Sequence, residues 1–253
     1  MDRKERICAK CGAPFVTQVW MVKGEEAGAT VCGACRTKAR EAEEAQREKE
    51  AKLQRQERAR ELRLENSGLE GMEAMTFSNL QARPEVKELA TASDLLQELI
   101  PHCFGAVEAV HIVTLLGKCG LGKTHLAVAA GFKALENDYD VRFYRVPALV
   151  AALNSALFGD RAEYDELWKM VCHTALLVLD DFGTEKWTEN TLAYLDSLIA
   201  TRHQDCAWLL TIITSNLTLK QMPERIASRL QDRAVSRVFF LSGPDFRLIR
   251  PLT

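Results

Sequence analysis

The feature that most constrains this chain is residues 117–124, which fit the pattern G-x-x-x-x-G-K-T. The largely apolar run 111–116 before it predicts a buried strand, and the run 125–130 after it predicts a helix. A strand, a glycine-rich loop and a helix in this order form the context in which this pattern binds phosphate. The alternative, a glycine-rich turn that binds nothing, is disfavoured because both flanks fit. The residues of the loop are Gly117, Lys118, Cys119, Gly120, Leu121, Gly122, Lys123 and Thr124.

The residue types of this loop predict its chemistry. Glycines let the backbone bend so that successive N–H groups point at phosphate oxygens. The start of the following helix adds a partial positive charge. We expect Lys123 to reach the β- and γ-phosphates of ATP and the Thr124 hydroxyl to ligate Mg²⁺. The loop therefore predicts a site for a nucleoside triphosphate.

Composition limits the remaining classes of function. The chain has 253 residues, 47% of them hydrophobic, which is enough for one large domain or for one domain with an appendage. The formal net charge of -2 excludes a global basic field, so any contact with nucleic acid must be local. We find no signal peptide and no run near the roughly 18 apolar residues of a membrane span. We therefore expect a cytoplasmic protein with no membrane contact.

Four of the eight cysteines form two C-x-x-C pairs within the first 35 residues, separated by 20 residues. This spacing predicts a structural Zn²⁺ site with four thiolate ligands, Cys8, Cys11, Cys32 and Cys35. Redox cysteines are the alternative, and two matched pairs disfavour it. A module this small buries little apolar surface, so the metal would supply its folding energy. A small core, a docking patch or both account for its apolar residues Phe15, Val16, Val19, Trp20 and Met21.

The composition changes sharply over residues 36–66, which contain no Gly or Pro. Helix-forming residues fill this stretch, and acidic and basic side chains recur at helical spacing. Its apolar residues are mostly alanine, so no broad apolar stripe is available to face a core. We predict a solvated, semi-rigid helical spacer. A coiled coil remains the alternative, whereas the matched acids and bases disfavour a basic arm for nucleic acid.

Strand and helix patterns then alternate along the chain, which predicts an α/β fold with a parallel sheet wrapped by helices. Ligands of such sheets bind at the carboxyl ends of the strands. The expected strands are 111–116, 141–146, 176–180, 208–214 and 237–241. The expected helices are 84–90, 92–100, 124–136, 147–157 and 189–203.

Polar side chains end two of the expected strands. Asp180 and Asp181 follow the apolar run 176–179, where Asp180 would hold Mg²⁺ opposite Thr124 and Asp181 would polarise the attacking water. Asn216 ends the strand from 208, and a strand between those of the loop and of Asp180 would bring its amide beside the γ-phosphate. Each motif taken alone is also typical of a simple turn.

A helix that begins at Pro223 places Arg225 and Arg229 one turn apart on one face. An exposed arginine of this kind suits a subunit that reaches into the nucleotide site of its neighbour. The alternative is an ordinary surface arginine.

Together these motifs resemble the AAA+ ATPases of the bacterial helicase-loader family, the DnaC and DnaI proteins and their phage relatives. The resemblance covers roughly residues 76 to 250 and rests on the order and spacing of its motifs. It implies a five-stranded parallel sheet flanked by helices, without the separate lid of many AAA+ proteins. The motifs are residues 77–80, 117–124, 177–183, 213–217, 225–230 and 243–247.

The resemblance also implies a role for each site residue. Lys123 and Thr124 take the Walker A positions and Asp180 the Walker B position. Asp181 takes the position of the catalytic carboxylate, where the wider superfamily usually has glutamate. The remaining roles are sensor 1 for Asn216, the arginine finger for Arg229 and sensor 2 for Arg247.

The expected organisation has three parts. Residues 1–36 form a four-cysteine zinc-binding module that docks a partner and resembles the N-terminal domain of the DnaI branch. Residues 37–70 form a charged helical linker. Residues 71–253 form the AAA+ ATPase domain. We refer to residues 1–36 below as the N-terminal module.

The function implied is ATP-dependent loading of the hexameric replicative DNA helicase, with ATP, Mg²⁺ and Zn²⁺ as cofactors. Subunits would form a homo-oligomer when ATP binds, hold single-stranded DNA and release the helicase on hydrolysis. The alternative is a transposition helper ATPase of the IstB type, which shares the ATPase motifs. A third reading is a zinc-dependent adaptor whose ATPase domain is a nucleotide-gated scaffold. The N-terminal module and the linker favour the loader, because together they suit a tethered head that binds a partner.

Overall fold

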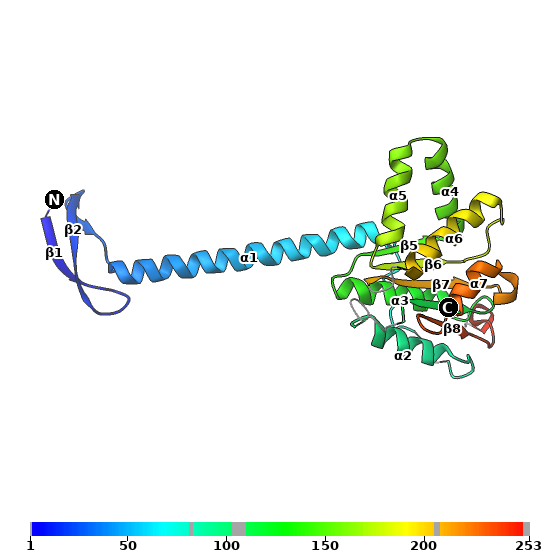
Figure 1. The fold of residues 1–253 in the computed structure, drawn as a ribbon. Helices are drawn as coiled ribbons and strands as arrows, with labels where there is room; N and C mark the ends of the chain where they lie inside the picture. The colour runs from blue at the N-terminus through cyan, green and yellow to red at the C-terminus, as the bar shows by residue number, and fades with distance from the viewer. Residues whose placement is uncertain (1, 81–82, 103–109, 205–207, 250–253) are drawn as a thin grey trace. The chain divides into compact units, whose positions relative to one another are not determined.

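The computed structural model describes residues 2–80, 83–102, 110–204 and 208–249, except for the side chains of residues 247 and 249. The chain divides into two compact units, residues 1–59 and residues 60–253. Figure 1 shows the elements of each. We call residues 60–253 the C-terminal unit and describe the two units separately.

A three-stranded antiparallel sheet begins the chain, in the order β1-β2-β3. Its strands are β1 (Asp2–Ile7), β2 (Pro14–Val22) and β3 (Glu25–Gly28). Among the apolar residues described in this part, only Cys8 and Val19 are buried. Apolar burial alone therefore gives this sheet very little stability.

Helix α1 (Gly33–Ser67) follows and is 35 residues long. It begins three residues before the predicted stretch, and its side chains are exposed or half-buried until Ser67. The helix ends at Ser67, and the next residue, Gly68, has a left-handed φ of 75°. The next residue, Leu69, is fully buried in the apolar core of the C-terminal unit. The end of α1 is thus fixed to that unit.

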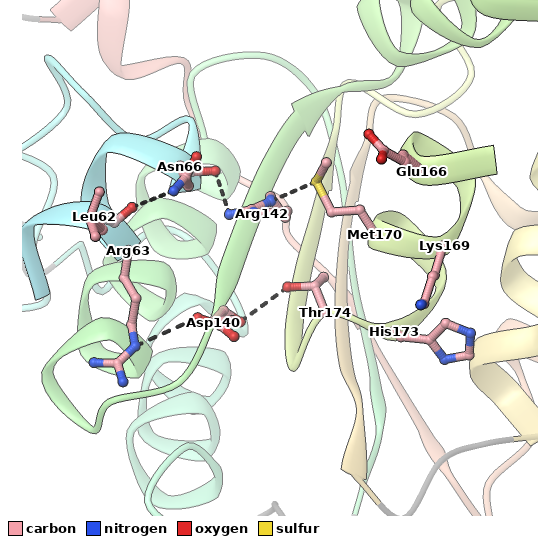
Figure 2. A pocket seen from close by; sticks show the side chains of 10 residues that line it. All are labelled: Leu62, Arg63, Asn66, Asp140, Arg142, Glu166, Lys169, Met170, His173 and Thr174. Atoms are coloured by element: carbon pink, nitrogen blue, oxygen red, sulfur yellow. Dashed lines mark hydrogen bonds and ion pairs between the residues drawn. The ribbon is translucent and has the colours of Figure 1, made fainter. Parts of the chain in front are cut away.

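Polar contacts hold the end of α1 beside a hollow of about 500 Å³ that α5 (Arg161–His173) also lines (Figure 2). Arg142 donates to the Asn66 carbonyl at 2.6 Å and to the Met170 sulfur at 2.8 Å. Arg63 pairs with Asp140 at 3.6 Å. Asp140 precedes the first residue of β5, so this hollow lies at the amino ends of the parallel strands, opposite the phosphate loop.

Five parallel strands form the sheet of the C-terminal unit, in the order β5-β6-β7-β4-β8. The predicted fold class is confirmed, and each predicted strand lies within two residues of an observed one. β7 lies between β4 and β6, as the placement of Asn216 required. The strands are β4 (Ile112–Leu116), β5 (Val141–Arg145), β6 (Leu176–Asp180), β7 (Leu210–Ser215) and β8 (Ser236–Phe240).

Helices cover both faces of this sheet (Figure 1). Side chains alternate along β4, so that Val113 and Leu115 pack with α2 (Leu89–Leu99) and α3 (Lys123–Glu136) in one apolar core. Ile112 and Leu116 face a second core with the helices of the other face. Those helices are α4 (Val146–Phe158), α5 (Arg161–His173), α6 (Glu189–Gln204) and α7 (Glu224–Leu230).

One helix prediction is wrong. Residues 84–88 do not form a helix, because Glu88 adopts a left-handed φ of 61° and Lys87 pairs with Ser242 beyond β8. Helix α2 therefore begins at Leu89. The predictions also did not include α5 or the strands of the N-terminal module.

The sequence contains no apolar run long enough to predict a membrane-spanning helix. In the described ranges, no helix combines the length and the apolar character that a membrane span needs.

Candidate functional site

The phosphate loop joins the carboxyl end of β4 to α3. Gly122 has a left-handed φ of 91° at the N-cap, and α3 begins at the next residue, Lys123. Gly120 also has a positive φ, of 71°. Because other residues rarely adopt such angles, the glycines at these two positions allow the tight turn that brings backbone N–H groups to the start of a helix.

Lys123 is buried, with 7% of its surface exposed. Its Nζ donates to the carbonyls of Gly117 and Lys118, both at 2.7 Å, and to Oδ1 of Asn216 at 2.9 Å. The Asn216 contact joins the loop to the end of β7. The structure thus brings together two residues that the sequence predicted to act on the same phosphate.

Asp180 ends β6 and is 1% exposed. Its Oδ1 accepts from the Thr124 hydroxyl at 2.8 Å and from the Thr214 hydroxyl at 2.6 Å. Burial raises the pKa of the Asp180 carboxyl, while the hydrogen bonds from Thr214 and Thr124 lower it. The buried Asp180 carboxylate and the half-buried Thr124 hydroxyl beside it are hard oxygen donors, which suit Mg²⁺.

Asp181 has a left-handed φ of 56°, which is uncommon for a residue with a side chain. The turn is held from both sides: its N–H donates to Thr214 Oγ1 at 3.1 Å, and its carbonyl accepts from Thr184 Oγ1 at 2.8 Å. Strained backbone of this kind concentrates at functional sites, where surrounding contacts maintain it. The turn places Asp181 directly after the buried Asp180.

The predicted arginines lie on other elements. Arg229 and Arg225 are both on α7. The Arg229 guanidinium pairs with Asp196 of α6 and donates to the Arg225 carbonyl at 3.4 Å, and neither partner belongs to the phosphate loop. Arg247 belongs to α8 (Phe246–Ile249), and its side chain lies outside the described ones.

Comparison with known families covers the region that contains this site. The family model described as "IstB-like ATP binding protein" matches residues 37–239, which is most of the chain. The chain belongs to this IstB-like ATP-binding family. The IstB-like match contains the phosphate loop, Asp180, Asp181, Asn216 and Arg229.

Individual relatives of this IstB-like chain include an insertion-sequence protein and a helicase loader. A putative insertion sequence ATP-binding protein, y4pL of Sinorhizobium fredii (strain NBRC 101917 / NGR234), is 32% identical over 176 residues, which cover 66% of this chain and 70% of that protein. The replicative helicase loader DnaI of Bacillus subtilis (strain 168) is 28% identical over 140 residues, which cover 51% of this chain and 43% of DnaI. By sequence, the insertion-sequence protein is the more similar of the two.

Among solved structures, the crystal structure of the DnaC helicase loader superposes with a TM-score of 0.58 at 19% identity. The match covers 68% of this IstB-like chain and 99% of the loader chain. Identity this low shows a shared fold and leaves the partner open.

The four cysteines of the N-terminal module gather at one point. The sulfurs of Cys8, Cys11, Cys32 and Cys35 all lie within 4.8 Å of one another. Cys11 and Cys32 are 3.8 Å apart, and a tetrahedral zinc site with bonds of about 2.3 Å needs about this separation. The donor set and its spacing therefore fit a structural Zn²⁺ site.

The backbone around these sulfurs also suits thiolates. The N–H groups of Cys32 and Lys10 donate to Cys8 Sγ at 3.3 and 3.4 Å, and the Cys32 bond contributes most to lowering the pKa of Cys8 to about 6. Hydrogen bonds with the thiols of Cys11 and Cys32 raise the pKa of Cys35 to about 12. Four crowded sulfurs cannot all ionise alone, and a divalent cation removes that conflict.

Sequence reasoning missed three polar residues of the C-terminal unit. Thr214 belongs to the motif 213–217 but was given no role, although its hydroxyl donates to Asp180. Arg83 and Arg202 carried no local signal. Arg202 is 1% exposed, and burial lowers its pKa to about 9. Its guanidinium donates to five neutral oxygens, the hydroxyl of Thr211 and the carbonyls of Val171, Cys172, Thr174 and Leu210.

Proposed function

We propose that this IstB-like chain hydrolyses ATP at the carboxyl ends of β4, β6 and β7. Two contacts support the proposal most directly, Lys123 with Asn216 and Thr124 with Asp180. In the proposal, Lys123 binds the β- and γ-phosphates, and Thr124 and Asp180 hold Mg²⁺. The metal, when bound, neutralises charge on the phosphates.

Hydrolysis in this proposal depends on Asp181 and Asn216. Phosphate oxygens would take the place of the three oxygens that Lys123 now contacts, one of which belongs to Asn216. The freed Asn216 amide then orients a water molecule, and the Asp181 carboxylate polarises it. The strained backbone at Asp181 supports this role, because it sets the direction in which this short side chain leaves the backbone.

Assembly follows from the proposed role of Arg229 as a finger for a neighbouring subunit. Within one chain Arg229 pairs with Asp196, and this contact would exchange for the γ-phosphate of the neighbour. Arg229→Ala should therefore bind ATP normally and hydrolyse it slowly. Mixing it with Asp181→Asn protein should restore part of the activity, because some interfaces then pair an intact carboxylate with an intact finger. No recovery in complexes that demonstrably contain both variants would contradict the role.

We propose further that the chain loads a hexameric replicative helicase and that the N-terminal module is its docking head. Antiparallel register places Val16, Trp20 and Val22 on one face of the small sheet, with Ile7 beside Pro14 on the same face. The four apolar side chains are 49% to 73% exposed. Phe15 lies on the opposite face and is half-buried, so Trp20 rather than Phe15 is the proposed anchor.

The second candidate, a helper ATPase for transposition, rests on the sequence comparisons, where insertion-sequence ATP-binding proteins are more similar than DnaI. The loader has the support of the N-terminal module, which lies before the region that the IstB-like family model matches. Both candidates predict DNA binding that needs ATP. The chain is near neutral, so local basic patches of several subunits must add up, and salt must weaken the contact.

One experiment with the full chain separates the two candidates. We expect the hexameric replicative helicase of the source cell to retain the chain, and ATP to induce binding to single-stranded DNA. Trp20→Ser should abolish helicase binding and spare DNA binding. The matched control is Met21→Ser, because Met21 is 68% exposed on the other face of the same sheet. A chain that ignores the helicase and prefers duplex DNA would establish the transposition helper instead.

A further inference from the structure

The phosphate loop contacts two segments that are far from it in the sequence, residues 83–88 and residues 240–246. Residues 83–88 run beside residues 240–246, where the Lys87 N–H donates to the Ser242 carbonyl at 3.0 Å and the Phe240 N–H donates to the Glu88 carboxylate. The loop is the third segment. A methyl group on Gly120 would lie 1.6 Å from a carboxylate oxygen of Asp245 and 3.0 Å from the backbone nitrogen of Phe246, so a larger residue would displace Asp245 or the backbone beside it.

Arg83 connects all three segments. Its Nη1 donates to the Gly120 carbonyl at 2.9 Å, and its Nη2 donates to the Pro244 carbonyl at 2.8 Å. The guanidinium carbon lies 5.0 Å from the centre of the Phe246 ring. The side chain is 8% exposed and also pairs with Glu85 at 3.5 Å. Such a set of bonds uses the planar fork of arginine, which lysine cannot reproduce.

The carbonyl that Arg83 holds belongs to the turn of the phosphate loop. The Phe246 N–H donates to the same Gly120 oxygen at 3.1 Å. In a planar trans peptide, the C=O of Gly120 and the N–H of Leu121 point in opposite directions. Fixing this oxygen therefore fixes the N–H of Leu121, one of the groups that a phosphate loop offers to its ligand.

We propose that Arg83 is a positioning residue of the nucleotide site, which joins the phosphate loop to the segment 240–249 so that both respond to ATP together. This coupling would move α8, the helix of Arg247, when phosphate enters the loop. The inference rests on the proposed ATP chemistry and is independent of the helicase partner. Its failure is therefore distinguishable from failure of the loader role.

The test compares Arg83→Met and Arg83→Lys with the wild-type full chain. Arg83→Met should weaken binding of Mg–ATP, measured by calorimetry, by about tenfold, since it removes two hydrogen bonds from a charged donor. Arg83→Lys keeps one donor and should give an intermediate affinity. The matched control is Arg161→Met, because Arg161 also forms an ion pair and stacks on an aromatic ring, with Asp165 and Tyr164 of α5. Its affinity for Mg–ATP should equal that of the wild type.

Hydrogen exchange separates positioning from mere stability. In the wild type, ATP should slow exchange in both the loop 117–124 and the segment 240–249. In Arg83→Met, the loop should still respond while the segment does not. An unchanged response of the segment, or wild-type affinity in the folded Arg83→Met protein, would overturn the proposal. Failure of both Arg83 variants to fold would also overturn it, because Arg83 would then be a structural residue only.

Discussion

In the C-terminal unit, β4, β6 and β7 are buried at every residue, whereas β2 of the N-terminal module buries Val19 alone. The larger unit has two apolar cores, one on each face of its sheet. The smaller sheet has one face of exposed apolar side chains and four clustered cysteines. Burial therefore stabilises the first region, whereas apolar burial gives the second very little stability, and a metal at its four cysteines would supply what is missing.

This difference matters for function as well as stability. In the C-terminal unit, a rigid sheet places the buried Asp180 and Lys123 within reach of residues on neighbouring strands. In the N-terminal module, apolar side chains that a core would normally use remain available for a partner. With zinc at its four cysteines, the module would fold while keeping such a face exposed.

Zinc removal should have the largest effect and should divide the two regions. Wild-type protein should carry about one zinc per chain, and apparent binding free energies of zinc-finger peptides reach about 10–16 kcal/mol. Cys8→Ser with Cys11→Ser should therefore lose the zinc and unfold β1–β3, while ATP binding and the main unfolding transition persist. Metal analysis and amide NMR measure both. Cys119→Ser, outside the cluster, should keep its zinc, and zinc-free wild-type protein prepared without chelators would exclude the site.

Arg202→Met should have the next largest effect, in the opposite region. It leaves five neutral oxygens without their donor in the interior of the C-terminal unit. We expect unfolding to become easier by about 3–5 kcal/mol, measured by denaturant titration, with zinc content unchanged. Arg161→Met removes an exposed ion pair and should cost less than about 1 kcal/mol. Equal stability of Arg202→Met and the wild type would contradict this role, because it would mean that water replaces the guanidinium at the five oxygens without loss of stability.

Variants of the nucleotide site should change chemistry without changing either fold. Lys123→Ala should weaken ATP binding by about a hundredfold or more, because the phosphates lose a charged donor. Asp181→Asn should bind ATP normally and turn it over slowly, because only the polarisation of water is lost. Calorimetry and a phosphate-release assay measure the two steps. Undiminished turnover by Asp181→Asn would remove that carboxylate from the mechanism, and no turnover by the wild type would favour the nucleotide-gated scaffold.

Short sequence patterns predicted those features that depend on residues close together in the chain. Apolar runs marked the strands, the glycine-rich pattern marked Lys123 and Thr124, and the polar residues at strand ends marked Asp180 and Asn216. The parallel sheet then required these ends to meet. The parallel sheet thus brought together motifs that, taken one at a time, are weak evidence for a nucleotide site.

Contacts between distant segments were not predictable in the same way. The left-handed turn at Glu88 replaces an expected helix because residues 83–88 pair with residues beyond β8. Arg83 and Arg202 are single arginines whose partners are mostly backbone carbonyls of other segments. Every residue has a backbone carbonyl, so the sequence does not indicate which carbonyls these arginines bind. The two faces of β2 were hidden too, because apolar residues lie on both of them, so the strand shows no alternation of apolar and polar residues.

Mild acid should give the smallest effect and should act on the C-terminal unit, which holds all five histidines. His111 is 1% exposed beside β4, and burial lowers its pKa below the ordinary value of about 6.5. Between these two pKa values the unfolded chain binds a proton that the folded chain does not. Stability must therefore rise with pH across this window and fall as pH drops from 7 to 5.5.

The measurement is urea unfolding followed by tryptophan fluorescence at pH 7 and pH 5.5. In a Trp20→Phe background the remaining tryptophans all belong to the C-terminal unit, so the signal reports on that unit alone. His111→Leu should reduce the loss of stability between the two pH values, whatever its effect at pH 7. His173→Leu, at an exposed position on α5, should leave the loss unchanged. Equal pH dependence in both variants would assign the acid sensitivity to groups other than His111.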